Sequence, residues 1–197
     1  NEGTLANYLA GYYKRTGQRC AVHPVSRLDR DTFGVVLLAK NAYVHELMRR
    51  QHAGGGMEKT YHALTCGILD PPEGEIDAPI ARVPGDSLLR EIRPDGKPAS
   101  SRYRVLEARA GCAKLELSPL TGRTHQLRLH CAYLGCPILG DPQYGTPGSL
   151  TLSARYGIAG QQLCAVRLRF LHPMTKKTVE IRAAGDVSLD FLERTVV

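Results

Sequence analysis

The sequence predicts an α+β fold, in which helices and loops flank a largely antiparallel, mixed β-sheet. Several segments alternate apolar and polar residues with the two-residue period of a strand, and others repeat apolar residues at helical spacing. Short turns join most neighbouring strand segments, which favours hairpins over crossover connections. The 197 residues, 43% of them hydrophobic, suffice for a single domain over 1–197 with its own core.

Three amphipathic segments are predicted to be helices, and each carries a terminal signal. Thr4 and Asn41 are N-cap residues that precede the first two segments, and Gly135 follows the third at the position where a left-handed residue ends a helix. Asp186 begins a short terminal helix. The predicted helices span 4–17, 41–51 and 124–134.

The predicted strands follow from alternation and from turn residues. An unbroken apolar run over 34–39 has the length of one buried strand. Two segments on either side of Gly111 form a hairpin, and a short strand near 75–80 lies within a surface excursion over 70–98. The remaining strands are expected at 59–67, 100–110, 113–118, 163–171 and 178–183.

Composition limits the classes of partner and compartment. The net charge is +7 and arginine outnumbers lysine, which favours bidentate contacts to phosphate and therefore a nucleic-acid partner. The six cysteines show no CxxC pair, so we expect buried thiols and no disulfide framework. No apolar stretch approaches the roughly 20 residues that span a bilayer and no signal-peptide pattern is present, so we expect a soluble, cytoplasmic protein without membrane contact.

One acidic residue stands out by its neighbours. The segment HPVSRLDRDTFGVVLLAK places Asp29 between Arg27 and Arg30. Nearby cations favour an ionised carboxylate, and such a group can act as nucleophile or base. Taken alone, an RLDR tetrapeptide is more typical of an exposed salt-bridge run. The rest of the chain must therefore decide its role.

Three segments together resemble the RluA-type pseudouridine synthases. They read HPVSRLDRDTFG, EKTYHALTCG and SPLTGRTHQLRLHCAYLGCPILGDPQYG, and the third match is long and ungapped. The resemblance extends over nearly the whole chain. It implies the pseudouridine synthase catalytic fold with an active-site cleft across the sheet, and an enzyme that isomerises uridine in structured RNA, ribosomal or transfer RNA, without a metal or organic cofactor.

The resemblance also implies site residues. The aspartate of the RLDR motif carries over to Asp29 as the catalytic residue, the tyrosine of the second motif to Tyr61, and the arginine after Thr-Gly to Arg123. Asp29 can attack the base or the sugar, or abstract a sugar proton, and the sequence leaves these routes open. We expect Arg123 to pair with Asp29, and Tyr61 to stack on the flipped base or to accept a proton.

Further basic residues are candidates for RNA contact. We expect Arg27, Arg30 and Arg128 to bind phosphates or to support the Asp29 loop, and His125 to lie near the pocket. The pair His125 and His130 invites a metal hypothesis, but the i, i+5 spacing does not bring both rings to one helix face, so we expect no metal site. A wider basic rim is expected from Lys14, Arg15, Arg19, Arg49 and Arg50.

Two positions depart from the family pattern, and other functions stay open. Ser26 stands where a histidine usually precedes the arginine, and Phe33 where a serine usually follows the threonine. Compared with family members, we expect that the upstream strand and any S4 RNA-binding domain are missing from the given sequence. We also expect a monomer. The alternatives are a non-catalytic RNA-binding protein on the same scaffold and, less favoured, a hydrolytic enzyme with Asp31 as second carboxylate.

Overall fold

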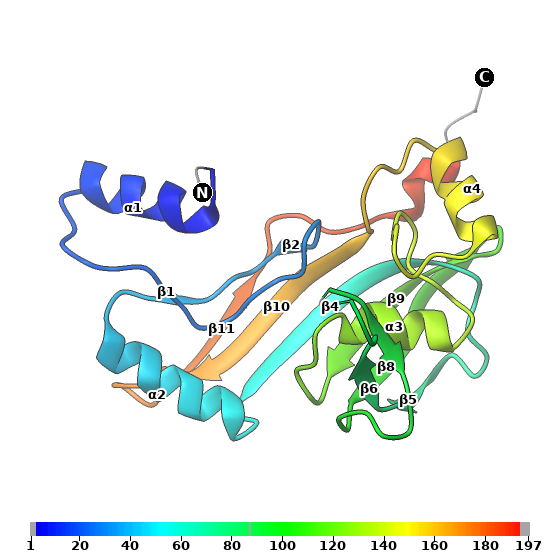
Figure 1. The fold of residues 1–197 in the computed structure, drawn as a ribbon. Helices are drawn as coiled ribbons and strands as arrows, with labels where there is room; N and C mark the ends of the chain where they lie inside the picture. Colours follow the sequence, from blue (N-terminus) through cyan, green and yellow to red (C-terminus); the bar gives the residue numbers. More distant parts are fainter. Residues whose placement is uncertain (1–2, 87, 194–197) are drawn as a thin grey trace. The chain divides into compact units, whose positions relative to one another are not determined.

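The computed structural model describes residues 3–86 and 88–193, in which the chain forms two compact units (Figure 1). Three strands, β4 (Met57–Cys66), β10 (Leu163–Leu171) and β11 (Thr178–Arg182), each contribute residues to both units. Unit 1 contains Asn1–Leu28, Val36–Glu58 and Arg169–Glu180, and unit 2 contains Asp29–Val35, Lys59–Leu168 and Ile181–Val197.

Unit 1 holds the two helices that the capping signals predict. In α1 (Leu5–Arg15) the Thr4 hydroxyl accepts from the Asn7 amide at 3.2 Å. In α2 (Ala42–Ala53) the Asn41 side chain accepts from the Val44 amide at 2.8 Å. Each cap satisfies an N–H that would otherwise lack a partner within its helix. Both predicted helix starts are confirmed.

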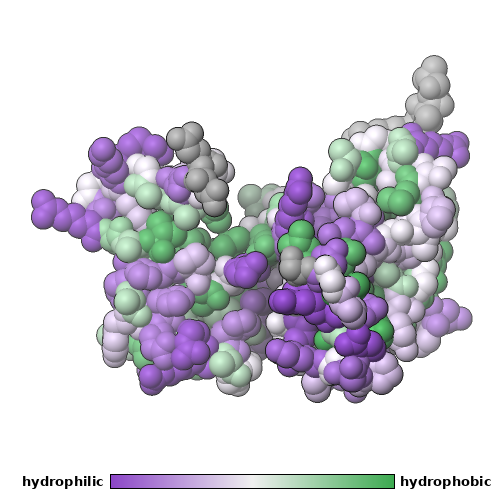
Figure 2. Space-filling model, viewed as in Figure 1, coloured by the Kyte–Doolittle hydropathy of each residue, from purple (hydrophilic) through white to green (hydrophobic). Residues whose placement is uncertain are grey.

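The surface of α2 is polar. Met48 is the buried residue of this helix, and hydrophilic side chains cover most of its visible face (Figure 2). The guanidinium groups of Arg49 and Arg50 both bind Glu46 on the same helix. These two exposed arginines share one carboxylate, so a positive charge remains here and their place in a basic rim stays a prediction.

The apolar run over 34–39 does not form one strand. Phe33 and Gly34 make the short strand β2 (Phe33–Gly34), which pairs in parallel with Cys164 and Ala165 of β10. Further on, β3 (Leu38–Ala39) pairs with β1 (His23–Pro24) in unit 1. The two ends of the run have different partners, and the residues between them are only half-buried. The prediction of a single buried strand is wrong for this reason.

The main sheet is largely antiparallel, as predicted. Its order among the described residues is β11-β10-β4-β9-β8-β5, with β2 beside β10. Strands β8 (Ser100–Arg109) and β9 (Cys112–Pro119) form the predicted hairpin around Gly111. Strand β9 also pairs antiparallel with β4, and this register places Tyr61 opposite Leu117.

The excursion over 70–98 holds more structure than the sequence indicated. It contains β5 (Glu73–Asp77), which pairs with β8, and the small hairpin β6 (Ile80–Arg82) and β7 (Arg90–Ile92). The expected strand near 75–80 is interrupted because Pro79 has no N–H for a strand ladder. The excursion is thus part of the sheet architecture and not only a surface loop.

Both faces of the sheet in unit 2 are buried. Ala63 and Leu64 are adjacent in β4 yet belong to two different apolar clusters, as the alternation of a strand requires. The cluster around Ala63 includes residues of α3 (Gln126–Tyr133). The cluster around Leu64 is completed by α4 (Pro147–Arg155) and the 3₁₀ helix η1 (Leu189–Glu193).

Two helix boundaries differ from prediction at the C-terminal side. The terminal helix begins at Leu189 and not at Asp186, and the Asp190 amide donates to the Ser188 hydroxyl at its start. The Asp186 carboxylate instead accepts from Lys114 Nζ. Helix α4 was not predicted, although Thr146 caps it and Pro147 occupies its first turn. No helix in the described part of the chain is long and apolar enough to cross a membrane.

Candidate active site

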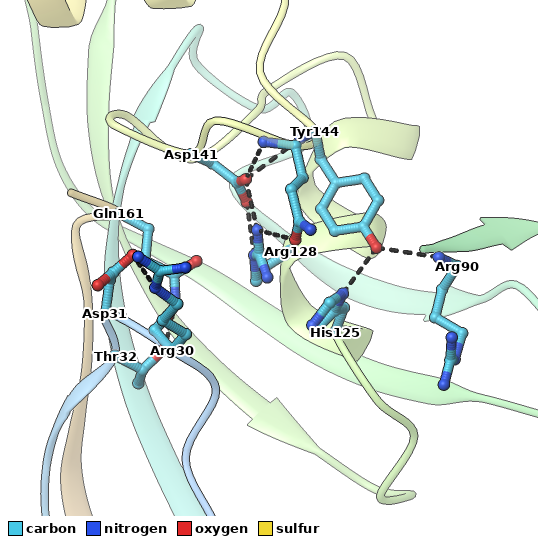
Figure 3. Close-up of polar contacts among 10 residues, drawn as sticks. Arg30, Asp31, Thr32, Arg90, His125, Arg128, Asp141, Tyr144 and Gln161 are labelled. Carbon is cyan, nitrogen blue, oxygen red and sulfur yellow. Dashed lines mark hydrogen bonds and ion pairs between the residues drawn. The ribbon is translucent and has the colours of Figure 1, made fainter. Parts of the chain in front are cut away.

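The Asp29 loop lies on unit 2 and is built as a tight turn. The Thr32 amide donates to the Asp29 carbonyl at 3.1 Å, and Asp31 adopts a left-handed φ of 65° that aspartate tolerates better than most residues. Gln161, 2% exposed, donates from Nε2 to the Arg30 carbonyl and to the Thr32 hydroxyl (Figure 3). The loop is therefore held by a side chain that lies 131 positions further along the sequence.

The glycine that follows this loop is required by close approach. Gly34 has φ +109°, and a Cβ there would lie 2.3 Å from the Ala165 carbonyl oxygen. The Val35 amide donates to the same carbonyl at 2.9 Å. An L-residue would clash with β10 and would adopt a strained backbone. The glycine thus lets the chain from Asp29 to Val35 lie directly against β10.

Tyr61 lies within electrostatic reach of Asp29. It sits on β4, half-buried against the cluster that includes Ala63. Burial, and to a smaller extent the nearby Asp29 carboxylate, together raise the pKa of the Tyr61 phenol to about 12. Tyr61 is therefore a neutral phenol near pH 7. As such it can donate a hydrogen bond but cannot serve as a preformed phenolate base.

The alkaline titration of Tyr61 is testable. An ordinary tyrosine loses its proton near pH 10, so between about pH 10 and 12 the unfolded chain binds fewer protons at this position than the folded chain. We expect the free energy of unfolding of the wild type to fall over that window by up to about 2–3 kcal/mol more than that of Tyr61→Phe. Below about pH 9 the two free energies should change with pH in the same way. Urea denaturation at each pH measures this, and parallel curves for the two proteins would contradict it.

His125 also lies near Asp29 and is fixed by Tyr144. Its φ of 58° is left-handed, so α3 begins at Gln126 and not at the predicted Thr124. Its Nδ1 lies 2.7 Å from the Tyr144 hydroxyl, which also accepts from the Arg90 amide (Figure 3). Burial and the Arg128 charge lower the pKa of His125, while Asp29 opposes this shift. His125 is therefore a neutral imidazole within electrostatic reach of Asp29 at neutral pH.

Arg128 has a structural partner. It is 3% exposed, and its Nε and Nη2 bind the two oxygens of Asp141 at 2.7 and 2.6 Å. Its guanidinium also lies 4.8 Å from the centre of the Tyr144 ring. The Asp141 carboxylate further accepts from the Gln143 and Tyr144 amides, so it shapes the turn that follows it. Arg128 is thus not available for phosphate, which corrects its assignment to RNA contact.

Arg123 does not pair with Asp29. It is exposed, and its Nε donates to the Pro98 carbonyl at 2.9 Å. No ion pair within residues 3–86 and 88–193 includes Arg123 or Asp29. The loop that carries Arg123 is held by Gln126, whose Oε1 accepts from the Arg123 amide and from the Thr121 hydroxyl. The expected Arg123–Asp29 pair is replaced by contacts that point Arg123 to solvent.

The other predicted RNA contacts differ in environment. Arg30 is almost fully exposed and lies 3.9 Å from the Asp31 carboxylate. Arg27 is exposed in unit 1.

His130 is fully buried, and its two ring nitrogens lie within hydrogen-bond distance of the Ser101 hydroxyl and the Ala78 carbonyl. Of the two family departures, Ser26 accepts a hydrogen bond from the Leu37 amide, and Phe33 is 42% exposed.

Sequence analysis missed the buried amides and the tyrosine that organise the site. These residues are Gln126, Gln161 and Tyr144. Gln126 belongs to the quoted third motif, where a polar residue on the inward side of a predicted helix was a usable signal. The sequence around Gln161 gave no signal of this kind, because Gln161 precedes a strand that is far from Asp29 in sequence.

Gln161 is expected to position the Asp29 loop. Gln161→Leu keeps the buried volume but removes both hydrogen bonds to the loop, so we expect any reaction that uses the Asp29 carboxylate to slow by about 10–100-fold under single-turnover conditions. Affinity for the substrate should change little. Gln162→Leu is the matched control, because the amide of Gln162 contacts Gly160 and not the loop. An equal rate for the two variants would exclude a positioning role for Gln161.

Comparison with known proteins identifies the class of protein. The family model of RNA pseudouridylate synthases matches residues 2–133, more than half of the chain, so the chain belongs to this family. Among solved structures, human RNA Pseudouridylate Synthase Domain Containing 1 has a TM-score of 0.75 and 28% identity, and the match covers 90% of this chain and 74% of that chain. The resemblance and the fold predicted from the three motifs are thereby confirmed.

Curated relatives are similar over most of the chain. RNA pseudouridine synthase YjbO of Bacillus subtilis is 37% identical over 92% of this chain and 62% of that protein. Ribosomal large subunit pseudouridine synthase C of Vibrio cholerae is 36% identical over 84% of this chain and 52% of that protein. The chain thus spans between half and two thirds of the length of these relatives.

Proposed function

We propose that the chain isomerises uridine to pseudouridine in structured RNA, with Asp29 as its catalytic carboxylate. The observation that carries the proposal is the grouping of Asp29 with Tyr61 and His125 in a chain that belongs to the RNA pseudouridylate synthase family. No side-chain hydrogen bond or ion pair within residues 3–86 and 88–193 occupies the Asp29 carboxylate. The carboxylate is therefore available to a substrate.

The reaction is balanced without an external reagent. The bond between C1′ of the ribose and N1 of the base breaks, the base turns, and C1′ joins C5. The proton on C5 is then lost and N1 gains one. Asp29 assists the first step as nucleophile or base and can take part in the final proton transfer. The sequence motifs and the proposed chemistry call for no metal or organic cofactor.

The remaining residues bind and orient the RNA in this proposal. Tyr61, a neutral phenol, offers its ring and hydroxyl to the flipped base. His125, the N-cap residue of α3, interacts electrostatically with the proposed catalytic carboxylate. Arg27, Arg30 and Arg123 are exposed and contact phosphates. Ribosomal RNA is the first substrate to test, because one relative is named for the large ribosomal subunit, and transfer RNA is the second. We expect a monomer that acts in the cytoplasm.

Tritium release tests the proposed activity. Large-subunit ribosomal RNA and transfer RNA are transcribed with uridine that carries tritium at C5, and each is incubated with the protein. Isomerisation replaces the label at C5, so release of tritium to water is the expected result. Binding of these transcripts without any release would instead support a non-catalytic RNA-binding protein on the same scaffold.

A further inference from the structure

Unit 2 contains a cationic groove outside the residues described for catalysis. It has a volume of about 470 Å³ and lies between the β6–β7 hairpin, the turn at residues 95–97 and the loop that carries Arg123. The groove residues that matter for charge are Arg82, Arg90, Lys97, Arg123 and Asp95. Four cations thus line it against one carboxylate.

Two cations of the groove, Arg82 and Lys97, have no carboxylate partner among the described residues. The one carboxylate of the groove, Asp95, already accepts from the Arg93 guanidinium. Arg82 and Arg90 are direct cross-strand partners in the hairpin, and like charges at such positions destabilise a strand pair. Asp86 acts on Arg90 electrostatically, but it does not line the groove. An anion between these side chains would relieve their repulsion.

The walls of the groove are fixed before any ligand binds. Lys97 and Ile80 exchange two backbone hydrogen bonds of 2.9 Å, which joins the turn to β6. The bond from Arg123 Nε to the Pro98 carbonyl joins the opposite wall to the same turn. Cations on a rigid frame lose less conformational entropy on binding than cations on free loops.

Gly122 leaves room for a ligand in this wall. Its φ lies outside the left-handed region, and an added Cβ would meet none of the described heavy atoms within 4 Å. Neither backbone strain nor packing inside the chain therefore requires a glycine here. Its peptide stays open to the groove, where a phosphate oxygen can approach the backbone.

The groove connects to the candidate active site through one hydrogen-bonded chain. The Arg90 amide donates to the Tyr144 hydroxyl, and this hydroxyl lies 2.7 Å from His125 Nδ1 (Figure 3). His125 interacts electrostatically with both Arg90 and Asp29. An RNA strand with one nucleotide at Asp29 can thus continue past His125 toward the β6–β7 hairpin.

We propose that this groove binds consecutive phosphates of the RNA strand beside the target uridine. The inference rests on the proposed function. It assigns to the groove the binding energy that offsets extraction of the base from the RNA. Unstacking a nucleotide costs a few kcal/mol, and phosphate contacts offset it. An acidic protein segment fits less well, because peptide binding usually needs an apolar anchor and the apolar lining residues Ile80 and Ala81 are buried.

RNA affinity and its salt dependence test the groove. The double variant Arg82→Gln/Lys97→Gln is titrated into a fluorescein-labelled RNA hairpin with a uridine-rich loop. We expect its Kd to rise about tenfold and the slope of log K against log salt to fall in magnitude by about 2. Single-turnover tritium release at limiting RNA should fall by about the same factor as the affinity, because the groove supplies part of the binding energy that extracts the base.

A matched control separates the groove from general charge. Arg102→Gln/Arg104→Gln removes the same charge from exposed β8 residues that already bind Glu75 and Glu116, so RNA affinity should change little. Equal losses in both double variants, or equal binding of poly-glutamate and RNA, would overturn the groove assignment. Failure of the proposed function is distinct: wild type would then release no tritium, whereas the groove would still bind RNA.

Discussion

Asp29→Asn is expected to abolish pseudouridine formation while the protein stays folded. The variant keeps the size of the side chain but removes the charge that acts as nucleophile or base, so single-turnover tritium release should fall by at least about 10²–10⁴-fold. The fold should persist because only the Asp29 carbonyl takes part in the loop turn, and asparagine keeps that carbonyl. RNA affinity should stay within a few-fold of wild type.

The neighbouring carboxylate provides the control for this experiment. Asp31→Asn makes the same chemical change two positions away, in a residue whose carboxylate lies beside the exposed Arg30. We expect it to retain most of the activity. If Asp29→Asn released tritium at the wild-type rate, Asp29 would not be the catalytic residue. Loss of tritium release in both variants with intact folding would mean that the reaction also needs the Asp31 carboxylate.

Arg128→Met is expected to cost the largest amount of stability. Arg128 and Asp141 are 3% and 1% exposed, and removal of one partner leaves the other charge buried. Such a change typically costs about 3–5 kcal/mol. Urea denaturation should show this loss as a lower midpoint. A second consequence follows at the site, because Arg128 packs on the Tyr144 ring that holds His125.

Two further variants show whether the stability loss in Arg128→Met is caused by the buried, unpaired Asp141 charge. Arg102→Met breaks an exposed ion pair with Glu75 and should cost less than about 1 kcal/mol. Asp141→Asn in the Arg128→Met background removes the orphaned charge but keeps an oxygen that can accept from the Gln143 amide, so part of the stability should return. A single-variant loss below about 1 kcal/mol would mean that the pair is not structurally important.

Local signals were sufficient for much of the fold. The caps at Thr4 and Asn41 fixed two helix starts, and the alternation around Gly111 fixed a hairpin, because each depends on residues within a few positions. The run over 34–39 shows where such signals end. Hydrophobicity predicted a strand, but it does not tell which partner each end will find, and here β10 takes one end and β1 the other.

In the candidate site, too, some features could be predicted from local sequence signals and others could not. The motif around Asp29 and the strand that carries Tyr61 were recognisable in the sequence, and the structure brings these two residues within electrostatic reach of each other. The environments of the arginines were not recognisable. Arg123 and Arg128 are five positions apart, yet one is exposed and the other is enclosed with Asp141. Only the three-dimensional fold determines which of two similar cations meets a buried carboxylate.

The distance in sequence between Asp29 and Gln161 has a consequence for synthesis on the ribosome. A domain is made from its N-terminus, and contacts between distant segments form only after both have emerged. The RLDR motif appears early, but the amide that holds its loop and the β10 strand against which Gly34 lies are made more than a hundred residues later. A nascent chain that already displays the acid therefore lacks the support of its loop until Gln161 and β10 have been translated.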